Sequence, residues 1–282
     1  MAKPYATNTI RNFPSRINPI AKEVQDVFDG VEAQVRSFAQ NTTSAINGLL
    51  ISGDAGTGKT YTVKRALIAL NKHQHVEYIK GGKITAASLY VKLWLNRAKH
   101  RIVILDDVDI IHHTEKNKII PMILGACDLG FDREVSWETA RPNALMEQVG
   151  CYDMSFKFEG TLIWITNDTI DDIQKACKQW KSALLSRFNV ARCYFTDEQK
   201  YMYTMHLCEN KGMLNGNCVD HKMPNGTPGY PVTIIEQALE YMENNYRKLV
   251  EITPRIALKI ADTFYYQTDP LLRDAILQQM WK

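Results

Sequence analysis

The chain of 282 residues is 45% hydrophobic and 23% charged, with a formal net charge of +3, which is ordinary for a globular protein. No apolar run approaches the ~18 residues of a membrane span, and the segment MAKPYATNTIRNFPSR lacks the hydrophobic stretch of a secretory signal. We therefore expect no membrane partner, and the small net charge by itself makes no case for nucleic-acid binding.

The six cysteines are scattered along the sequence and form no C-x-x-C pair. In a chain of this size they indicate free thiols in a reducing compartment, not a disulfide or zinc framework. A cytoplasmic location is the corresponding expectation. The residues are Cys127, Cys151, Cys177, Cys193, Cys208 and Cys218.

Residues 1–18 form a basic amino-terminal tail, because Lys3, Arg11 and Arg16, followed by Lys22, precede the first acidic residue of the chain. A solvated tail is the favoured interpretation. An arm that contacts DNA is the alternative. Beyond the tail, apolar residues at helical spacing predict a helix over 19–40.

Residues 53–60 read GDAGTGKT and match the phosphate-binding pattern G-x-x-x-x-G-K-[ST]. A short apolar run at 47–52 predicts a buried strand before this loop, and apolar residues at helical spacing predict a helix after it. Strand, glycine loop and helix is the context in which the motif binds nucleotides.

The residue types of this loop explain its chemistry. The glycines allow turns that aim several backbone N–H groups at one phosphate chain, and the helix N-terminus adds partial positive charge. Lys59 can reach the β- and γ-phosphates, and the Thr60 hydroxyl can ligate Mg²⁺. The predicted nucleotide contacts here are Gly53, Asp54, Ala55, Gly56, Thr57, Gly58, Lys59, Thr60 and Tyr61.

Strands and helices continue to alternate as far as residue 195, which predicts a mainly parallel sheet covered on both faces. The polar stretch 128–160 interrupts the alternation as an insertion, with a strand pair around REVSW and MSFKF. Further strands are predicted at 76–80, 102–105, 161–166 and 189–195, and helices at 85–99, 115–127 and 170–185.

The remainder of the chain, residues 196–282, is predicted to be a helical domain. Thr196 and Gln199 form a capping-box pattern that opens a helix ending near residue 210. A Gly/Pro/Asn-rich loop covers 212–231, and a helix follows around 235–242. Thr253-Pro254 and Asp269-Pro270 each predict a helix start with proline in the first turn. The α/β core is accordingly placed at 19–195.

Charged and polar residues follow two of the predicted strands. Asp106 and Asp107 end the run VILDD, where one carboxylate can hold Mg²⁺ through water and its neighbour can activate an attacking water. Asn167 follows the strand at 161–166, where its amide could hold the same water. Arg187 in ALLSRF and Arg255 in TPRIAL are candidate phosphate contacts because they follow these motifs in order.

In this order the motifs resemble those of the AAA+ ATPases, from about residue 20 to the end of the chain. GDAGTGKT is similar to the Walker A motif and VILDD to Walker B, while Asn167 falls at sensor 1, Arg187 at the arginine finger and Arg255 at sensor 2. The resemblance implies an α/β fold with a parallel five-stranded P-loop sheet flanked by helices and a small C-terminal all-helical lid.

The resemblance also implies an activity and partners. ATP and Mg²⁺ would be the cofactors, with Thr60 and Asp106 at the metal and with Asp107, Asn167 and Arg187 as the catalytic residues. Arg187 would act on the ATP of a neighbouring subunit in a homo-oligomer, expected to be a hexamer, and Arg255 would report the γ-phosphate to the lid. The small size and the run SFKFEGTLIWITN are most similar to bacteriophage-encoded members, which implies the cytoplasm of a bacterium or infected host.

Two departures from the family pattern bear on function. Walker B usually ends in Asp-Glu, whereas this chain has Asp106-Asp107, and the shorter carboxylate favours slow hydrolysis. The aromatic pore loop of protein unfoldases has no clear match. Residues 80–83 read KGGK there, which suits either a phosphate backbone or a solvated turn.

The insertion at 128–160 and two histidine-containing segments leave further alternatives. Arg133, Arg141 and Lys157 could meet nucleic acid beside Trp137 and Phe156, although packing of the two aromatic rings onto the core is favoured. A metal site at Asp109, His112 and His113 is disfavoured because adjacent histidines point apart. Cys218, Asp220 and His221 lack tight ligand spacing.

Two functions compete at this point. The leading hypothesis is a ring-forming ATPase that remodels or translocates DNA or a DNA-bound protein. The alternative is a slowly hydrolysing, ATP-gated switch or loader that acts on a protein partner, which the Asp-Asp pair and the single compact module favour. An inactive scaffold is disfavoured because every nucleotide-contact position carries a competent residue type.

Overall fold

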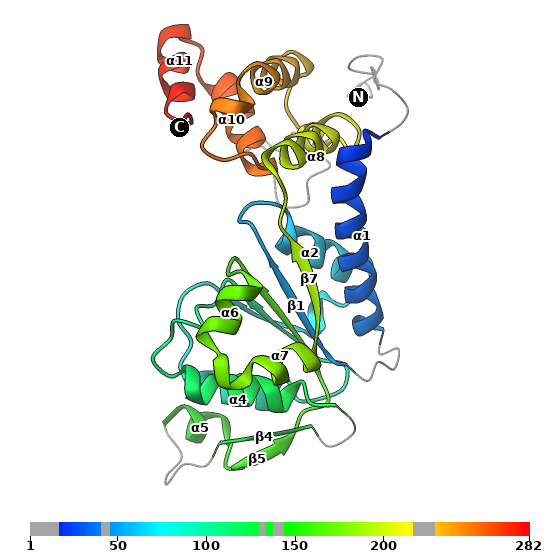
Figure 1. Cartoon of the computed structure of the whole chain (residues 1–282), viewed down its shortest axis with the longest axis vertical. Coiled ribbons are helices and arrows are strands. Elements are labelled where there is room, and N and C mark those ends of the chain that lie inside the picture. Colours follow the sequence, from blue (N-terminus) through cyan, green and yellow to red (C-terminus); the bar gives the residue numbers. More distant parts are fainter. Residues whose placement is uncertain (1–16, 41–45, 130–132, 138–143, 217–228) are drawn as a thin grey trace, which may run out of the picture. The chain divides into compact units, whose positions relative to one another are not determined.

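The computed structural model describes residues 17–40, 46–129, 133–137, 144–216 and 229–282 (Figure 1). They form two compact units, one of residues 27–55 and 59–194 and one of residues up to 26, 56–58 and 195–282. Several residues singled out above lie outside the described part of the chain, namely Lys3, Arg11, Arg16, Arg141, Cys218, Asp220 and His221. In the described part, no helix is long and apolar enough to cross a membrane.

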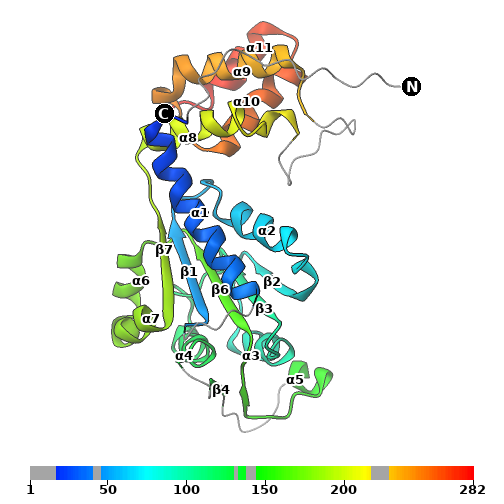
Figure 2. The same ribbon diagram turned by 90° about the vertical axis from the view of Figure 1, so that its right-hand side faces the viewer.

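The first unit is built on a five-stranded sheet of order β2-β3-β6-β1-β7, in which every pairing is parallel. Figure 2 shows β6 running between β1 and β3. The predicted parallel five-stranded P-loop sheet is thereby confirmed. The strands are β1 Gly48–Gly53, β2 Val76–Lys80, β3 Ile102–Asp106, β6 Thr161–Thr166 and β7 Phe188–Cys193.

Helices cover both faces of this sheet. The helices before and after the phosphate loop, α1 and α2, lie side by side (Figures 1 and 2), joined by the ion pair of Glu32 with Arg65. Right-handed crossovers put the helices that follow β2, β3 and β6 on the opposite face. β1, β3 and β6 are buried along their whole length, as expected for the centre of a parallel sheet. The helices are α1 Pro19–Ala39, α2 Lys59–Ala69, α3 Ala86–Leu95, α4 Lys116–Ala126, α6 Ile170–Ala176 and α7 Lys181–Arg187.

The insertion forms an antiparallel strand pair, β4 Glu134–Ser136 with β5 Ser155–Lys157, as the sequence predicts, and a short helix, α5 Ala144–Val149, that it did not. Trp137 and Phe156 pack on Tyr90, with ring centroids 5.6 Å and 5.1 Å away, which confirms the core-packing interpretation. Arg133 is buried and donates to the Gly160 carbonyl at 2.8 Å. The hypothesis that it meets nucleic acid is therefore wrong.

Two of the predicted helices differ from the helices in the structure. The helix predicted at 170–185 is broken at Cys177, where a single 3-10 turn, Lys178–Trp180, separates α6 from α7. Its buried positions still recur at helical spacing, so the sequence pattern hides the break. The helix predicted at 85–99 ends at Leu95 because the Asn96 amide bonds back to the Lys92 carbonyl at 2.8 Å and its oxygen accepts from Arg101.

The second unit is helical, in agreement with the predicted C-terminal helical domain. The Thr196–Gln199 capping box is present, and Thr253 and Asp269 cap the next two predicted helix starts. Its own core includes the stacked rings of Tyr201 and Tyr246, 4.0 Å apart. The helices are α8 Asp197–Glu209, α9 Val232–Asn245, α10 Pro254–Tyr266 and α11 Pro270–Gln278.

The five cysteines in the described residues are free, as the sequence predicts, and all five are buried. Burial raises the pKa of the Cys193 thiol to about 11, although the Lys59 charge opposes the shift. Cys193 therefore remains a neutral thiol near neutral pH.

Two helical glycines give a matched test of the packing. A Cβ on Gly125 of α4 would lie 2.3 Å from the Glu134 carbonyl oxygen of β4, whereas a Cβ on Gly30 of α1 would meet nothing within 4 Å. Gly125→Ala should lower the free energy of unfolding by about 1–3 kcal/mol through overpacking. Gly30→Ala should raise it by about 0.5–1 kcal/mol by favouring the helix. Chemical unfolding of both variants measures the two shifts, and shifts of the same sign would contradict this packing.

Candidate functional site

The strand order collects the predicted site residues at the carboxyl edge of the sheet. β6 lies between β3 and β1, and their ends are in register, with Asp106 opposite Ile165 and Ser52 opposite Thr166. Asn167 follows β6 and therefore stands between the carboxylates after β3 and the glycine loop after β1. The parallel sheet thus places three segments that are far apart in sequence at one edge.

Lys59 is the first residue of α2 and only 5% exposed. Its ammonium donates to the carbonyl oxygens of Gly53 at 2.8 Å and Asp54 at 2.7 Å, and to Asn167 Oδ1 at 2.9 Å. Burial lowers the pKa of Lys59, and nearby negative charges, that of Asp107 foremost, oppose the shift. Its three donors are therefore held toward the loop and the end of β6.

Asn167 connects Lys59 to Asp107. Its Nδ2 donates to Asp107 Oδ1 at 2.9 Å, while its Oδ1 accepts from Lys59. An ammonium only donates and a carboxylate only accepts, so this amide orientation is the one that satisfies both partners. The contacts join a cation, a neutral amide and an anion across the carboxyl edge.

The two neighbouring aspartates have different environments. Asp106 is 1% exposed, whereas Asp107 is exposed and has a left-handed backbone with φ of 54°. The Asp107 N–H donates to the Ile165 carbonyl at 3.0 Å, which fixes this turn against β6. Aspartate adopts the left-handed region more readily than most residues. The turn projects the Asp107 carboxylate out of the sheet toward Asn167.

Asp106 has two hydroxyl partners. Thr60 Oγ1 donates to its Oδ1 at 2.7 Å, and the phenol of Tyr78 on β2 donates to its Oδ2 at 3.1 Å. A hydroxyl and a carboxylate oxygen side by side are the hard donors that Mg²⁺ prefers, and phosphate oxygens and water complete such sites. Thr60 and Asp106 therefore fit the implied metal. Sequence reasoning missed Tyr78, because one tyrosine in the strand VEYIK gives no signal without the strand pairing.

The remaining loop residues divide between the two units. In the α/β unit, the Asp54 N–H donates to the Cys193 carbonyl at 3.2 Å, and a Cβ on Gly53 would lie 2.2 Å from that oxygen. Ala55 is exposed, and the Tyr61 ring faces the Arg65 guanidinium at 6.0 Å. Gly56, Thr57 and Gly58 cluster with the helical unit, and both glycines have positive φ, 74° and 110°.

A small pocket in the helical unit adjoins the loop. Thr57 lines it together with Phe195, Lys200, Tyr203 and Pro254. Arg255 follows Pro254 as the second residue of α10 and is exposed. Arg255 therefore directly follows Pro254, which lines the same pocket as Thr57 of the phosphate loop. The pocket mixes aromatic, aliphatic and amino groups.

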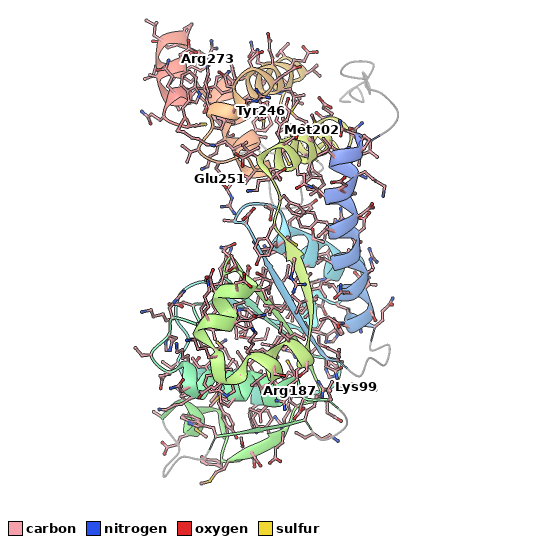
Figure 3. All side chains as sticks on the ribbon, viewed as in Figure 1. Lys99, Arg187, Met202, Tyr246, Glu251 and Arg273 are labelled. Carbon is pink, nitrogen blue, oxygen red and sulfur yellow. The ribbon has the colours of Figure 1, made fainter. Side chains whose placement is uncertain are left out.

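Arg187 is not brought to the carboxyl edge. It ends α7 at the amino end of β7, where its Nε lies 3.1 Å from Asp128 Oδ1 and its Nη1 donates to the Leu124 carbonyl at 3.2 Å (Figure 3). Six strand steps of about 3.3 Å separate it from Cys193, so roughly 20 Å lie between Arg187 and the phosphate loop of the same chain. Arg187 cannot reach that loop within one subunit.

The KGGK turn after β2 is bonded directly to the carboxylate segment. The Gly81 N–H donates to the Asp106 carbonyl at 2.8 Å, and the Asp109 N–H donates to the Gly82 carbonyl at 3.0 Å. Both glycines have positive φ, 62° and 72°, which lets the turn close tightly. The turn therefore holds the backbone on both sides of Asp107, while the lysines at positions 80 and 83 are exposed.

The histidine pair forms no metal site. His112 Nε2 lies 3.7 Å from Asp168 Oδ1, while His113 Nδ1 accepts from the Glu115 N–H at 3.0 Å. Across the described ranges, no group of three or more His, Cys, Asp or Glu residues could hold a metal ion. The disfavoured metal hypothesis thus gains no support.

The strand order, the glycine loop after β1, the Asp-Asp pair after β3, the asparagine after β6 and the helical C-terminal region are the fold and the motif placement that the resemblance to AAA+ ATPases implies for a P-loop protein. The particular family follows from a phage relative. An uncharacterised 36.7 kDa protein of the nrdC–mobD intergenic region of Enterobacteria phage T4 is 32% identical over 252 residues, covering 88% of this chain and 74% of the phage protein. The chain belongs to the family of this T4 protein.

Solved structures give weaker likenesses. The RuvB Holliday junction branch migration motor of Thermotoga maritima is 12% identical, with a TM-score of 0.36 over 87% of this chain and 69% of RuvB. NtrX from Brucella abortus, solved in complex with ATP, is 15% identical, with a TM-score of 0.39 over 90% of this chain and 56% of NtrX. At such scores neither likeness decides the fold, which rests on the strand order. No protein-family model matches the chain.

Proposed function

We propose that this chain is an ATPase that hydrolyses Mg-ATP at the subunit interfaces of a ring-like oligomer. The observation that carries the proposal is the continuous contact from Lys59 through Asn167 to Asp107, beside the Thr60–Asp106 pair. This arrangement presents a cation for the phosphates, a carboxylate for the attacking water and an amide between them, as phosphoryl transfer requires.

Each residue has a distinct task in this proposal. Lys59 exchanges its carbonyl partners for the β- and γ-phosphates, and the loop N–H groups hold the same phosphate chain. Asp107 accepts a proton from the attacking water, which Asn167 orients. Bound Mg²⁺, held by Thr60 and Asp106, would supply charge neutralisation between the β- and γ-phosphates. Arg255 contacts the γ-phosphate from the helical domain of 196–282.

The position of Arg187 supports an oligomer. Because it lies roughly 20 Å along β7 from the loop of its own chain, it can act as an arginine finger only on the site of a neighbouring subunit. A head-to-tail interface that supplies one arginine per site gives a ring when its rotation closes and a helical filament when it does not, and we propose a closed hexamer. The pair with Asp128 holds the guanidinium in place before it meets the neighbour.

DNA, or a protein bound to it, is the proposed substrate of the motor. The KGGK turn offers two exposed lysines to a phosphate backbone, and its bonds to Asp106 and Asp109 connect that contact to Asp107. The phage relative supports the cytoplasm of a bacterium or infected host as the location. A slow ATP-gated switch or loader remains the second candidate, because Asp107 is one methylene shorter than the usual glutamate.

Steady-state ATPase rates with and without single- and double-stranded DNA test this proposal. Lys59→Ala removes the cation on the phosphates and should lower the rate by about 10²- to 10³-fold or more, the cost of one transition-state donor. Stimulation of the wild-type chain by either DNA supports the motor. A slow rate that no DNA changes supports the switch or loader, and a wild-type rate equal to that of Lys59→Ala contradicts both.

Tyr78→Phe tests the metal side of the site. Loss of the phenol leaves Asp106 Oδ2 without its 3.1 Å donor and loosens the carboxylate beside Thr60. Loss of a group that hydrogen-bonds to a metal ligand commonly lowers the affinity for the metal by about 10- to 100-fold. The Mg²⁺ concentration for half-maximal ATPase should therefore rise about 10-fold, with little change in the rate at saturating Mg²⁺.

Tyr90→Phe is the matched control for this prediction. Tyr90 also loses one hydroxyl bond, to the Asp153 carbonyl at 2.8 Å, but on α3, where it packs against the insertion. It should leave the Mg²⁺ requirement unchanged. Equal Mg²⁺ requirements in the wild-type and Tyr78→Phe chains would show that Tyr78 does not position Asp106.

A further inference from the structure

Two short basic segments lie together at the amino edge of the sheet, opposite the nucleotide site. Residues 72–75 read KHQH and directly precede β2, and residues 99–101 read KHR and directly precede β3. β2 and β3 are adjacent and parallel, with Val76 opposite Ile102, so their preceding residues are neighbours. The amino-edge basic patch, as we call it, comprises Lys72, His73, His75, Lys99, His100 and Arg101.

Contacts within the patch hold the two segments together. The rings of His75 and His100 are 5.2 Å apart and nearly perpendicular. Arg101 donates from Nη1 to the Gln74 carbonyl at 3.4 Å and from Nε to Asn96 Oδ1 at 2.8 Å. These partners of Arg101 are neutral, so its positive charge stays uncompensated.

Carboxylates do not balance the patch. Within the described ranges, none of its six residues forms an ion pair with an aspartate or glutamate. The carboxylates of adjoining elements are engaged elsewhere, Glu77 with Lys92 and Asp153 with the Trp94 indole at 2.9 Å. Desolvation, and then the charges of His100, Lys72 and Arg101, lower the pKa of His75. Lys72, Lys99 and Arg101 therefore give the patch a net positive charge.

The side chains of the patch are accessible. His73, Lys99 and His100 are exposed, while Lys72, His75 and Arg101 are partly buried. Figure 3 labels Lys99, which lies three residues before Ile102, the first residue of β3. Lysine and arginine that face solvent without carboxylate partners are the usual contacts to phosphodiester oxygens.

We propose that the amino-edge basic patch binds the phosphate backbone of a nucleic acid, apart from the site at which ATP is hydrolysed. The choice of nucleic acid over an acidic protein rests on the proposed DNA-linked function. The KGGK turn gives this choice a second support, because the turn lies at the carboxyl end of β2 and the KHQH segment lies at its amino end. About five strand steps, roughly 16 Å, join the two basic ends, a span that one extended polyanion can follow.

The contact is sequence-independent in this proposal. The lysines and Arg101 of the patch offer point charges to phosphate oxygens, and such contacts fix position but carry no sequence information. Affinity should come from phosphate neutralisation and fall steeply with salt.

Fluorescence anisotropy with labelled single- and double-stranded DNA, in the absence of ATP, tests this inference on the full chain. The double variant Lys72→Glu with Lys99→Glu reverses two charges of the patch and leaves Arg101 and its anchor in place. We expect at least about 10-fold weaker binding at 0.1 M salt and a salt slope smaller by about 2, one unit for each lost phosphate contact.

A matched variant, Lys178→Glu with Lys181→Glu, changes the net charge equally in the same unit. Both lysines are exposed, in the 3-10 turn after α6 and at the start of α7. It should bind DNA nearly as the wild type does. Equal losses in the two double variants, or tighter binding of poly-glutamate than of DNA, would overturn the inference.

ATPase assays separate this inference from the proposed function. The Lys72→Glu, Lys99→Glu chain should keep the wild-type ATPase rate without DNA, because neither lysine touches the nucleotide site. If the wild-type chain hydrolyses no ATP but only the patch variant loses DNA binding, the patch stands and the proposed ATPase fails. If ATP is hydrolysed and the patch variant binds DNA as the wild type does, the inference fails alone.

Discussion

The contact of Asn167 with both Lys59 and Asp107 is the interaction on which the rest of the site depends. Asn167 is 108 residues from Lys59 and 60 from Asp107 in the sequence. Only the placement of β6 between β1 and β3 brings the three together. The left-handed turn at Asp107, bonded to Ile165, and the burial of Lys59 then aim the two charges at the same amide.

The same sheet separates two kinds of chemistry. Its carboxyl edge carries the carboxylates, the amide and the lysine, while its amino edge carries Arg187 and the basic segments before β2 and β3. In a parallel sheet all strands end at one edge, so residues that follow the strands lie at the opposite edge from residues that precede them. With this placement, Arg187 can act only on the nucleotide site of another subunit. The proposed hydrolysis therefore requires the proposed oligomer.

Much of this fold is readable from the sequence because its signals are local. The glycine loop, the buried strand that leads into Asp106 and the capping box at Thr196 and Gln199 each depend on neighbouring residues, and each has the predicted structure. What the sequence could not reveal depends on pairing between strands. Tyr78 meets Asp106 only because β2 lies beside β3, and the basic segments meet for the same reason. The break at Cys177 is hidden because buried positions keep their helical spacing across it.

The most direct test of the central claim is the ATPase rate of an equimolar mixture of Lys59→Ala and Arg187→Ala chains. The first lacks a working nucleotide site but supplies the arginine, and the second has the site but lacks the arginine. Each should be inactive alone. Random mixing should restore about a quarter of the wild-type rate, because half of the subunits keep Lys59 and half of those have a neighbour that keeps Arg187. A mixture no more active than its separate parts, or an Arg187→Ala chain with near-normal turnover, would contradict the account.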